Sequence, residues 1–280
     1  MLERPLNPSL ESVDRSSEVV RRSTNPAILT EAARQENAIA SRVQSAILPG
    51  EVDVEGLAIS AVMLPAEVVG GDYYDIIPVQ DGCWLAIGDV AGHGLSAGVI
   101  MLMIQSAVQS LVRLAPRASP RDLVCALNGA LYENVHNRMK SDEHVTFCLA
   151  RYSPDGSLVF AGAHENILIC REDGQFDSIP PNGVWLGILE DVSAVMPETD
   201  IQLGPGDIML LFSDGVTEAD DGRGQRFGIE RLRALLVANH DRSPQDVRDV
   251  IMDEVLRWGG RPQDDVTLVV VRCHGVYWGG

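Results

Sequence analysis

The chain has 280 residues, of which 45% are hydrophobic, and a formal net charge of −18 at pH 7. It is long enough for one large domain with a sizeable core plus an appendage, and its negative charge argues against a nucleic-acid partner, whose phosphates would repel it. Its five cysteines are odd in number, well spaced and mostly set in apolar runs, which predicts reduced core residues in a cytoplasmic protein.

The first 50 residues predict a tail and then a long helix. Residues 1–24 are polar and lack the apolar run of a signal peptide, so a flexible tail is expected. Asn25-Pro26 is typical of a helix start, and the helix should run to Leu48, before Pro49-Gly50. One narrow face of this helix is apolar, with Ile28, Ala32, Ile39, Val43 and Ile47. We expect this linker or regulatory segment, 25–50, to bind a partner helix, a regulator or a second copy of the chain, or simply to dock onto the main domain.

The main domain is expected to span 51–275 and to alternate short strands with two helix pairs. Strands are predicted at 57–64, 73–79, 83–89, 144–152, 157–162, 166–171, 207–213 and 265–272. Helices are predicted at 95–114, 120–139, 228–239 and 244–258. The helix at 95–114 is interrupted by polar residues, so no membrane span is expected. Meandering strands with separate helix pairs indicate an α+β fold with mostly antiparallel sheets covered by helices.

Four aspartates stand where apolar strands meet glycine-rich turns, and they are the most informative feature of the chain. They are Asp72, Asp89, Asp214 and Asp264, the last followed by Asp265. A carboxylate at the rim of a buried strand loses hydration, and no Lys or Arg lies in these stretches to compensate it. Hard oxygen donors without His or Cys favour Mg²⁺ or Mn²⁺ over zinc. The alternative is that they are ordinary turn aspartates.

Several other catalytic signatures are absent from the sequence. It contains no GxxxxGK[ST] loop for nucleotide phosphates and no GxSxG elbow of a serine hydrolase. No cysteine has an arginine six residues downstream, which excludes the usual cysteine phosphatase cradle. The segment Gly92-His93-Gly94 is only a weak phosphate-loop signal.

Ordered motifs around the aspartates resemble one known family. The motifs are PAEVVGGDYYD (65–75), GDVAGHG (88–94), FSDGVTEA (212–219) and QDDVT (263–267). They look like those of the bacterial SpoIIE/RsbU-type serine/threonine phosphatases, within the metal-dependent type 2C (PPM) superfamily. The likeness runs from about residue 40 to 273, and residues 44–49 resemble the helix that leads into such domains.

The resemblance implies a fold and a metal centre. The fold would be a central antiparallel β-sandwich flanked by helix pairs, with two Mn²⁺ or Mg²⁺ ions at one end. Asp89 would bridge both ions, with the Val90 carbonyl on one of them. Asp72 would serve the second ion, while Asp214 and Asp264 would hold the first. Asp265 is either a ligand or a residue that orients its neighbour.

The resemblance also implies an activity. Water activated by two metals would attack phosphorus directly, with no protein nucleophile. The substrate would be a phosphoserine or phosphothreonine protein, by family likeness an anti-sigma-factor antagonist or a similar bacterial regulator. Two alternatives are a non-catalytic, partner-binding regulator that keeps the fold and a hydrolase of small phosphate esters.

Three further residues near the motifs are not assigned to the metal centre. His93 can protonate the leaving serine oxygen, although packing in its turn is the favoured interpretation. Asp75 is expected to be a solvated hairpin residue, and His164 a structural one. The arginine that grips phosphate in eukaryotic relatives has no counterpart in Pro65-Ala66-Glu67. The residue that grips the phosphate is therefore not identified.

Overall fold

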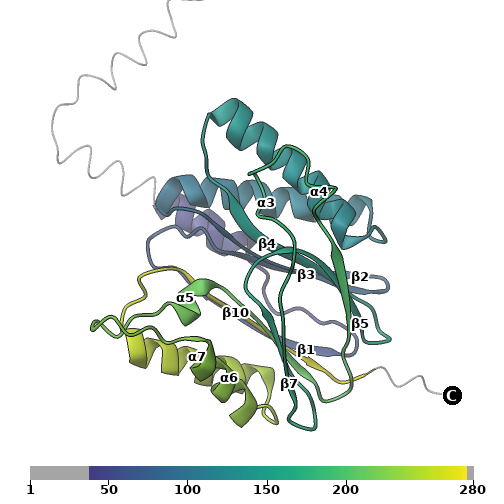
Figure 1. Ribbon diagram of the computed structural model, residues 1–280, viewed down its shortest axis with the longest axis vertical. Coiled ribbons are helices and arrows are strands. Elements are labelled where there is room, and N and C mark those ends of the chain that lie inside the picture. Colours follow the sequence, from purple (N-terminus) through teal and green to yellow (C-terminus); the bar gives the residue numbers. More distant parts are fainter. Residues whose placement is uncertain (1–37, 276–280) are drawn as a thin grey trace, which may run out of the picture.

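A computed structural model describes residues 38–275, and two five-stranded antiparallel sheets form its centre. The sheets pack face to face between two layers of helices (Figure 1). This arrangement confirms the predicted α+β fold with an antiparallel β-sandwich flanked by helix pairs.

Each sheet joins strands from distant parts of the chain. The first sheet has the order β1 (Leu57–Leu64), β10 (Val266–Cys273), β9 (Ile208–Phe212), β6 (Ile167–Cys170) and β7 (Phe176–Ile179). The second has the order β2 (Tyr73–Val79), β3 (Gly82–Val90), β4 (Val145–Tyr152), β5 (Ser157–Ala163) and β8 (Glu198–Gln202). The first and last strands of the domain, β1 and β10, are therefore hydrogen-bonded neighbours.

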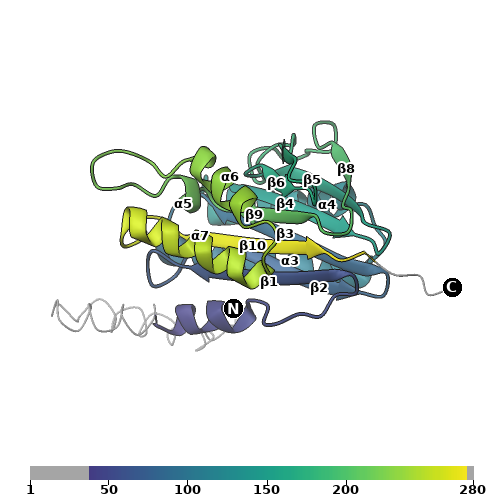
Figure 2. The ribbon, with the colours of Figure 1, turned by 90° about the horizontal axis from the view of Figure 1, so that it is seen from below.

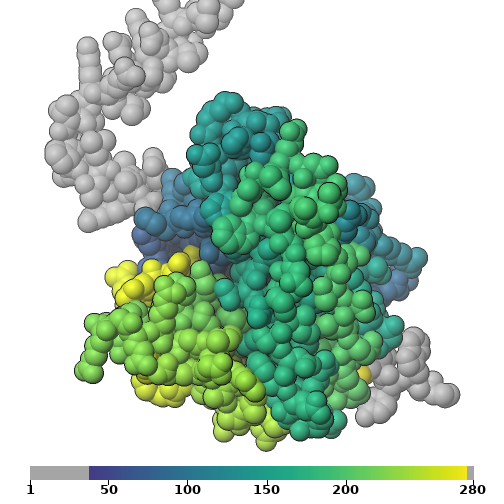
Figure 3. All heavy atoms as spheres, in the orientation of Figure 1, coloured from purple at the N-terminus to yellow at the C-terminus, as the bar shows by residue number. Residues whose placement is uncertain are grey.

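The helices cover the outer faces of the sheets. The second sheet is covered by α3 (Gly94–Leu114) and α4 (Pro120–Leu131), which continues into the π-helix η2 (Tyr132–Met139). The first sheet is covered by α6 (Ile229–Ala238) and α7 (Pro244–Gly259). Figure 2 shows α7 lying along β1 and β10. A short helix, α5 (Asp214–Thr217), directly follows β9. Green residues from the later middle of the chain cover one face between the helical layers (Figure 3).

Alternation along the strands creates three apolar layers. In β3, Trp84 packs toward α3 and α4, while Leu85 packs between the sheets. In β10, Leu268 packs toward α6 and α7, while Val269 lies between the sheets. Because successive side chains point to opposite faces, strands that are apolar throughout are required where both faces are covered.

Helix α3 is long and apolar enough, by length and composition, to cross a membrane, and core helices of folded domains pass the same test. It packs on β2, β3 and α4. Its residues Ile100, Met101, Ile104 and Val108 are fully or almost fully buried there. We therefore assign α3 to the core of the domain, as the sequence predicts.

The predicted elements differ from the structure in a few places. The helix predicted at 120–139 changes to π-helical geometry at Tyr132, and α5 was not predicted. Residues 38–47 are helical, as expected for the end of the linker helix. The predicted tail and the earlier part of that helix lie outside the described residues.

Candidate metal centre

The predicted acids lie at the ends of paired strands. Asp72 precedes β2, and Asp89 lies near the end of β3; the two strands pair with Tyr73 opposite Gly88. Asp214 follows β9, and Asp264 precedes β10, with Phe212 opposite Leu268. Antiparallel pairing therefore brings the acids of each sheet together at the same end of their strands.

Hydrogen bonds join these two pairs across the sandwich. The Thr267 hydroxyl of β10 donates to the Asp72 carboxylate. Asp265 Oδ2 accepts from the backbone N–H of Gly71 at 2.7 Å and of Asp72 at 3.3 Å, while its Oδ1 accepts from that of Ala66 at 2.8 Å. Both oxygens of Asp265 thus hold the loop that carries Asp72.

Two glycines let the backbone approach these acids. A Cβ on Gly70 would lie 2.2 Å from Asp265 Oδ2, and one on Gly71 would lie 2.8 Å from the Val90 carbonyl oxygen. Real Cβ atoms do not come that close, so any other residue here would displace the loop from Asp265 and Val90. The glycines in the 65–75 motif are therefore required by packing around the acids.

Burial and mutual repulsion dominate the electrostatics of the acids. Burial, followed by the charges of Asp214, Asp264 and Asp265, raises the pKa of Asp89 to about 8. Burial and the Asp89 charge raise the pKa of Asp72 well above its ordinary value. The pKa values of Asp214 and Asp264 are raised mainly by burial. The carboxylates are close enough to disfavour one another's ionised form.

Within residues 38–275, none of these five acids forms an ion pair with a basic side chain. Nor do three His, Cys, Asp or Glu side chains of this part of the chain already gather as a metal-binding group. Asp72 and Asp265 are buried, and Asp89 and Asp214 are partly buried. Clustered carboxylates in this setting are unfavourable without a cationic partner and suit a divalent cation with oxygen ligands. The donor set present therefore fits Mg²⁺ or Mn²⁺.

A cavity of about 310 Å³ separates Asp89 from Asp214. Its remaining lining residues are Thr146, His164, Glu165 and Trp185. Glu165 and Trp185 were not predicted as site residues, and nothing local in the sequence marks them, because they reach the cavity only through the tertiary fold.

His164 is a neutral side chain beside this cavity that links two strands by hydrogen bonds. Its Nδ1 lies 2.9 Å from Thr146 Oγ1, and its Nε2 lies 3.1 Å from the Phe212 carbonyl oxygen. Burial lowers its pKa to about 4, so the ring is neutral at pH 7. It joins β4 to the end of β9, next to Asp214, which agrees with the structural role expected from the sequence.

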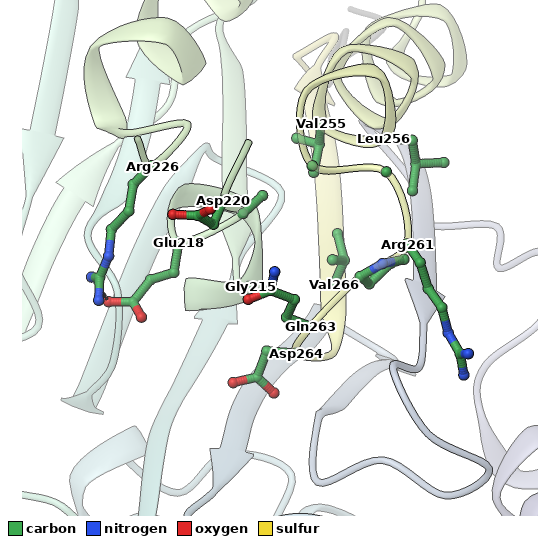
Figure 4. Close-up of a pocket in the computed structure, with 14 residues that line it drawn as sticks. Gly215, Glu218, Asp220, Arg226, Val255, Leu256, Arg261, Gln263, Asp264 and Val266 are labelled. Atoms are coloured by element: carbon green, nitrogen blue, oxygen red, sulfur yellow. Dashed lines mark hydrogen bonds and ion pairs between the residues drawn. The ribbon is translucent and has the colours of Figure 1, made fainter. Parts of the chain in front are cut away.

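A second cavity, of about 350 Å³, lies on another side of Asp264, between α5 and the end of α7 (Figure 4). Arg226 and Arg261 line it together with Glu218. Arg226 forms an ion pair with Glu218, while Figure 4 shows Arg261 extending on the opposite side of Asp264.

Residues 80–274 match the family described as Stage II sporulation protein E (SpoIIE). The chain belongs to the SpoIIE family. It is 31% identical over 246 residues to the phosphoserine phosphatase RsbU of Bacillus subtilis, covering 85% of this chain and 70% of RsbU. It is 24% identical over 257 residues to protein IcfG of Synechocystis, of which it spans 40%.

Solved structures agree with this SpoIIE-family assignment at the level of the fold. The SiaA-PP2C domain of Pseudomonas aeruginosa has a TM-score of 0.72 at 20% identity, covering 88% of this chain and 99% of that domain. The SpoIIE phosphatase domain with part of its regulatory domain, from Bacillus subtilis, has a TM-score of 0.65 at 21% identity, covering 81% and 66%. RsbX, solved with magnesium, has a TM-score of 0.57. The chain is a protein serine/threonine phosphatase of a metal-dependent family, as its motifs predicted.

Two minor expectations for this SpoIIE-family phosphatase are wrong. Asp75 is not solvated but 3% exposed, and it accepts from Gln109 Nε2 at 2.7 Å and from the Tyr73 hydroxyl at 3.2 Å. Strand alternation places Asp75 on the face of β2 that α3 covers, and hydrogen-bond donors are available there. His93 is not packed: its side chain is 83% exposed, and Nδ1 lies 3.1 Å from Glu67 Oε1.

Gln44 is a buried residue of the helix at 38–47, and it contacts the loop that carries Asp72. Its side chain is 3% exposed. Gln44 Nε2 donates to the Gly70 carbonyl at 2.8 Å, and the Gly70 N–H donates to Gln44 Oε1 at 3.0 Å. Gly70 therefore lies between Gln44 and Asp265, two residues before Asp72. In the sequence, residues 44–49 show only a likeness to the family, and nothing there marks a role for Gln44.

We expect Gln44→Leu to raise the Mn²⁺ concentration for half-maximal phosphatase activity about tenfold, because loss of a group that positions a ligand typically costs metal affinity. Activity at saturating Mn²⁺ should fall less. A Mn²⁺ titration of the initial rate measures this, with Ser45→Ala, one residue away on the exposed side of the helix, as the control. An unchanged titration midpoint would show that the contact does not act on the metal centre.

Proposed function

We propose that this phosphatase removes phosphate from serine or threonine of a small bacterial regulator, using two Mn²⁺ or Mg²⁺ ions held by Asp72, Asp89, Asp214 and Asp264. The observation that carries the proposal is a cluster of acids at the sheet ends, with Asp72 buried and Asp89 and Asp214 partly buried, none of them paired with a basic side chain in residues 38–275. Following the family pattern, Asp89 would be shared by both ions, and the Val90 carbonyl would serve one of them.

When bound, the metals neutralise phosphate charge and lower the pKa of the attacking water. Other residues of the chain position the acids and supply a proton donor. Asp265 holds the loop of Asp72, so we assign it a positioning role rather than a ligand role. His93, exposed and paired with Glu67, is the candidate to donate a proton to the leaving serine oxygen.

The substrate class is inferred from the relatives. RsbU is named a phosphoserine phosphatase. A structure of the RsbU and RsbW domains of Rv1364c from Mycobacterium tuberculosis has a TM-score of 0.67 at 22% identity. Both favour a partner-switching regulator in the cytoplasm, such as an anti-sigma-factor antagonist, as the substrate.

The substrate class is tested by comparing a phosphoserine protein with free phosphoserine. The kcat/KM for the protein should be far higher, because contacts remote from phosphorus contribute to binding of the transition state. Phosphate release at saturating Mn²⁺ measures both values. Equal values would support the hydrolase of small phosphate esters instead.

We also propose that the linker helix, predicted at 26–48, binds a regulator or a second copy of the chain. In its described part, Ile39 is 62% exposed and Val43 is 43% exposed. These apolar side chains lie on the same helix as Gln44, which contacts the loop before Asp72. A partner on this face would thus contact an element that is bonded to the candidate metal centre.

Ile39→Asp combined with Val43→Asp should change the molar mass or the phosphatase rate, because charges on an apolar contact surface cost several kcal/mol when buried by a partner. Light scattering and phosphate release on the double variant measure the two effects. Ser45→Asp, at an exposed position of the same helix, is the control. If the double variant had the same mass and rate as wild type, with and without a candidate regulator, the helix would have no role in binding or regulation.

A further inference from the structure

The segment 183–190 carries Trp185, which lines the 310 Å³ cavity beside Asp89 and Asp214, and the segment is held by backbone hydrogen bonds. The Gly183 N–H donates to the Gly162 carbonyl at 2.8 Å, and Leu186 exchanges two bonds with Val145 at 2.8 and 3.0 Å. The fully buried Asn128 of α4 accepts from the Gly187 N–H at 3.0 Å and donates to the Leu189 carbonyl at 2.9 Å. The segment is therefore anchored along its length.

This anchored segment exposes three large apolar side chains within five residues. Trp185 is 47% exposed, Ile188 is 51% exposed and Leu189 is 45% exposed. We call these three residues the Trp185 patch. Exposed apolar groups gain nothing from folding, and clusters of them on a rigid backbone mark interaction sites. Trp185 also stacks on His144, with ring centroids 5.0 Å apart and planes at 7°. The ring is thus held in place before any ligand arrives.

One member of the patch, Trp185, reaches the candidate active site. Trp185 lines the 310 Å³ cavity together with Asp89 and Asp214. The carbonyl of its stacking partner, His144, accepts from the Ala91 N–H at 2.9 Å, two residues after Asp89. A phosphorylated side chain that enters this cavity to reach Asp89 and Asp214 therefore comes close to Trp185.

We propose that the Trp185 patch binds an apolar side chain that flanks the phosphoserine of the protein substrate, and so selects phosphoproteins with apolar residues beside the phosphorylated position. This rests on the proposed function, because it describes the protein that enters the same site. A rigid aromatic side chain supplies contact area at low entropic cost, which suits recognition of a flanking residue. A free phosphate ester is too small to reach beyond the cavity to Ile188 and Leu189.

The test compares two phosphoserine dodecapeptides that differ only in flanking residues, leucine in one and serine in the other, at the two positions on each side. Wild type should show a kcat/KM about tenfold higher for the leucine peptide, because burying an apolar side chain contributes on the order of one to a few kcal/mol. Trp185→Ala should bring this ratio close to one, while Trp185→Phe, which keeps an aromatic ring, should retain most of it.

Two further variants guard against misfolding and general effects. Ile188→Ser combined with Leu189→Ser should also lower the ratio, without touching the wall of the cavity. Leu114→Ser is the matched control, because Leu114 is 84% exposed at the end of α3, outside the patch. Binding is read separately by fluorescence anisotropy of labelled peptides in which a phosphonate replaces the phosphate, and Trp185→Ala should weaken only the leucine peptide.

The outcomes separate this inference from the proposed function. If wild type hydrolyses neither phosphopeptide, the proposed function fails. If it hydrolyses both and the patch variants keep the wild-type ratio and anisotropy, the inference fails and the function stands. If the patch variants instead lower the molar mass in light scattering, the patch is an interface between copies of the chain, and the inference is equally wrong.

Discussion

Asp89→Asn should lower kcat by about three orders of magnitude or more while the fold survives, because the carboxylate that we propose both ions share would be lost. Asparagine keeps the size of the side chain, and Asp89 lies between the charges of Asp214, Asp264 and Asp265, which raise its pKa. Removing it should therefore relieve repulsion in the metal-free protein. Steady-state kinetics with a phosphoserine peptide at saturating Mn²⁺, together with circular dichroism, measure both effects.

The matched control for this variant is Asp81→Asn. Asp81 lies in the turn between β2 and β3, at the far end of the hairpin from Asp89, and pairs with Arg117 at 2.8 Å on the surface. It should keep wild-type kinetics. If Asp89→Asn retained activity within tenfold of wild type, Asp89 would have no place in the metal centre.

The metal-free protein should lose stability as pH rises from about 6.5 to 8. A carboxylate whose pKa is raised by folding, to about 8 for Asp89, stabilises the folded state while protonated, and this contribution is lost as pH rises through that value. Asp72, Asp214 and Asp264 shift in the same direction. His164 acts oppositely, but only between its folded pKa of about 4 and its ordinary value near 6.5. Above pH 6.5, the titration of His164 therefore adds little to the change in the free energy of unfolding.

Urea unfolding in a chelator at pH 6.5 and pH 8 measures this loss. Mn²⁺ should restore stability most at pH 8, because the ionised acids bind the cation and the folded state alone presents them together. Asp89→Asn should flatten the slope. A free energy of unfolding that stays constant or rises over this window in the chelator would contradict the electrostatic account.

The position of the acids at the strand ends could be predicted from the sequence because its signal is local. Each one follows or precedes an apolar strand within a glycine-rich turn, and strand alternation and turn chemistry are readable without tertiary contacts. The strands and most helix bounds were predictable for the same reason. The π-helix after Leu131 was not, since it continues α4 without a stop signal, and α5 was not, since four residues are too few to show a helical period.

Residues whose roles depend on distant neighbours could not be predicted. Asp75 was wrongly expected in solvent, because its donor Gln109 is 34 positions away on α3. Gln44 contacts Gly70 across 26 positions. Trp185 faces the acids only after its segment pairs with β4 and is fixed by Asn128. Composition and spacing contain none of these contacts.

The most direct test of the central claim is phosphate release from a phosphoserine peptide by the purified chain, with Mn²⁺ and again after removal of metal by a chelator. The acids at Asp72, Asp89, Asp214 and Asp264 predict turnover with Mn²⁺, loss of turnover in the chelator and recovery when Mn²⁺ is added back in excess. Undiminished turnover in the chelator would contradict the metal-dependent mechanism.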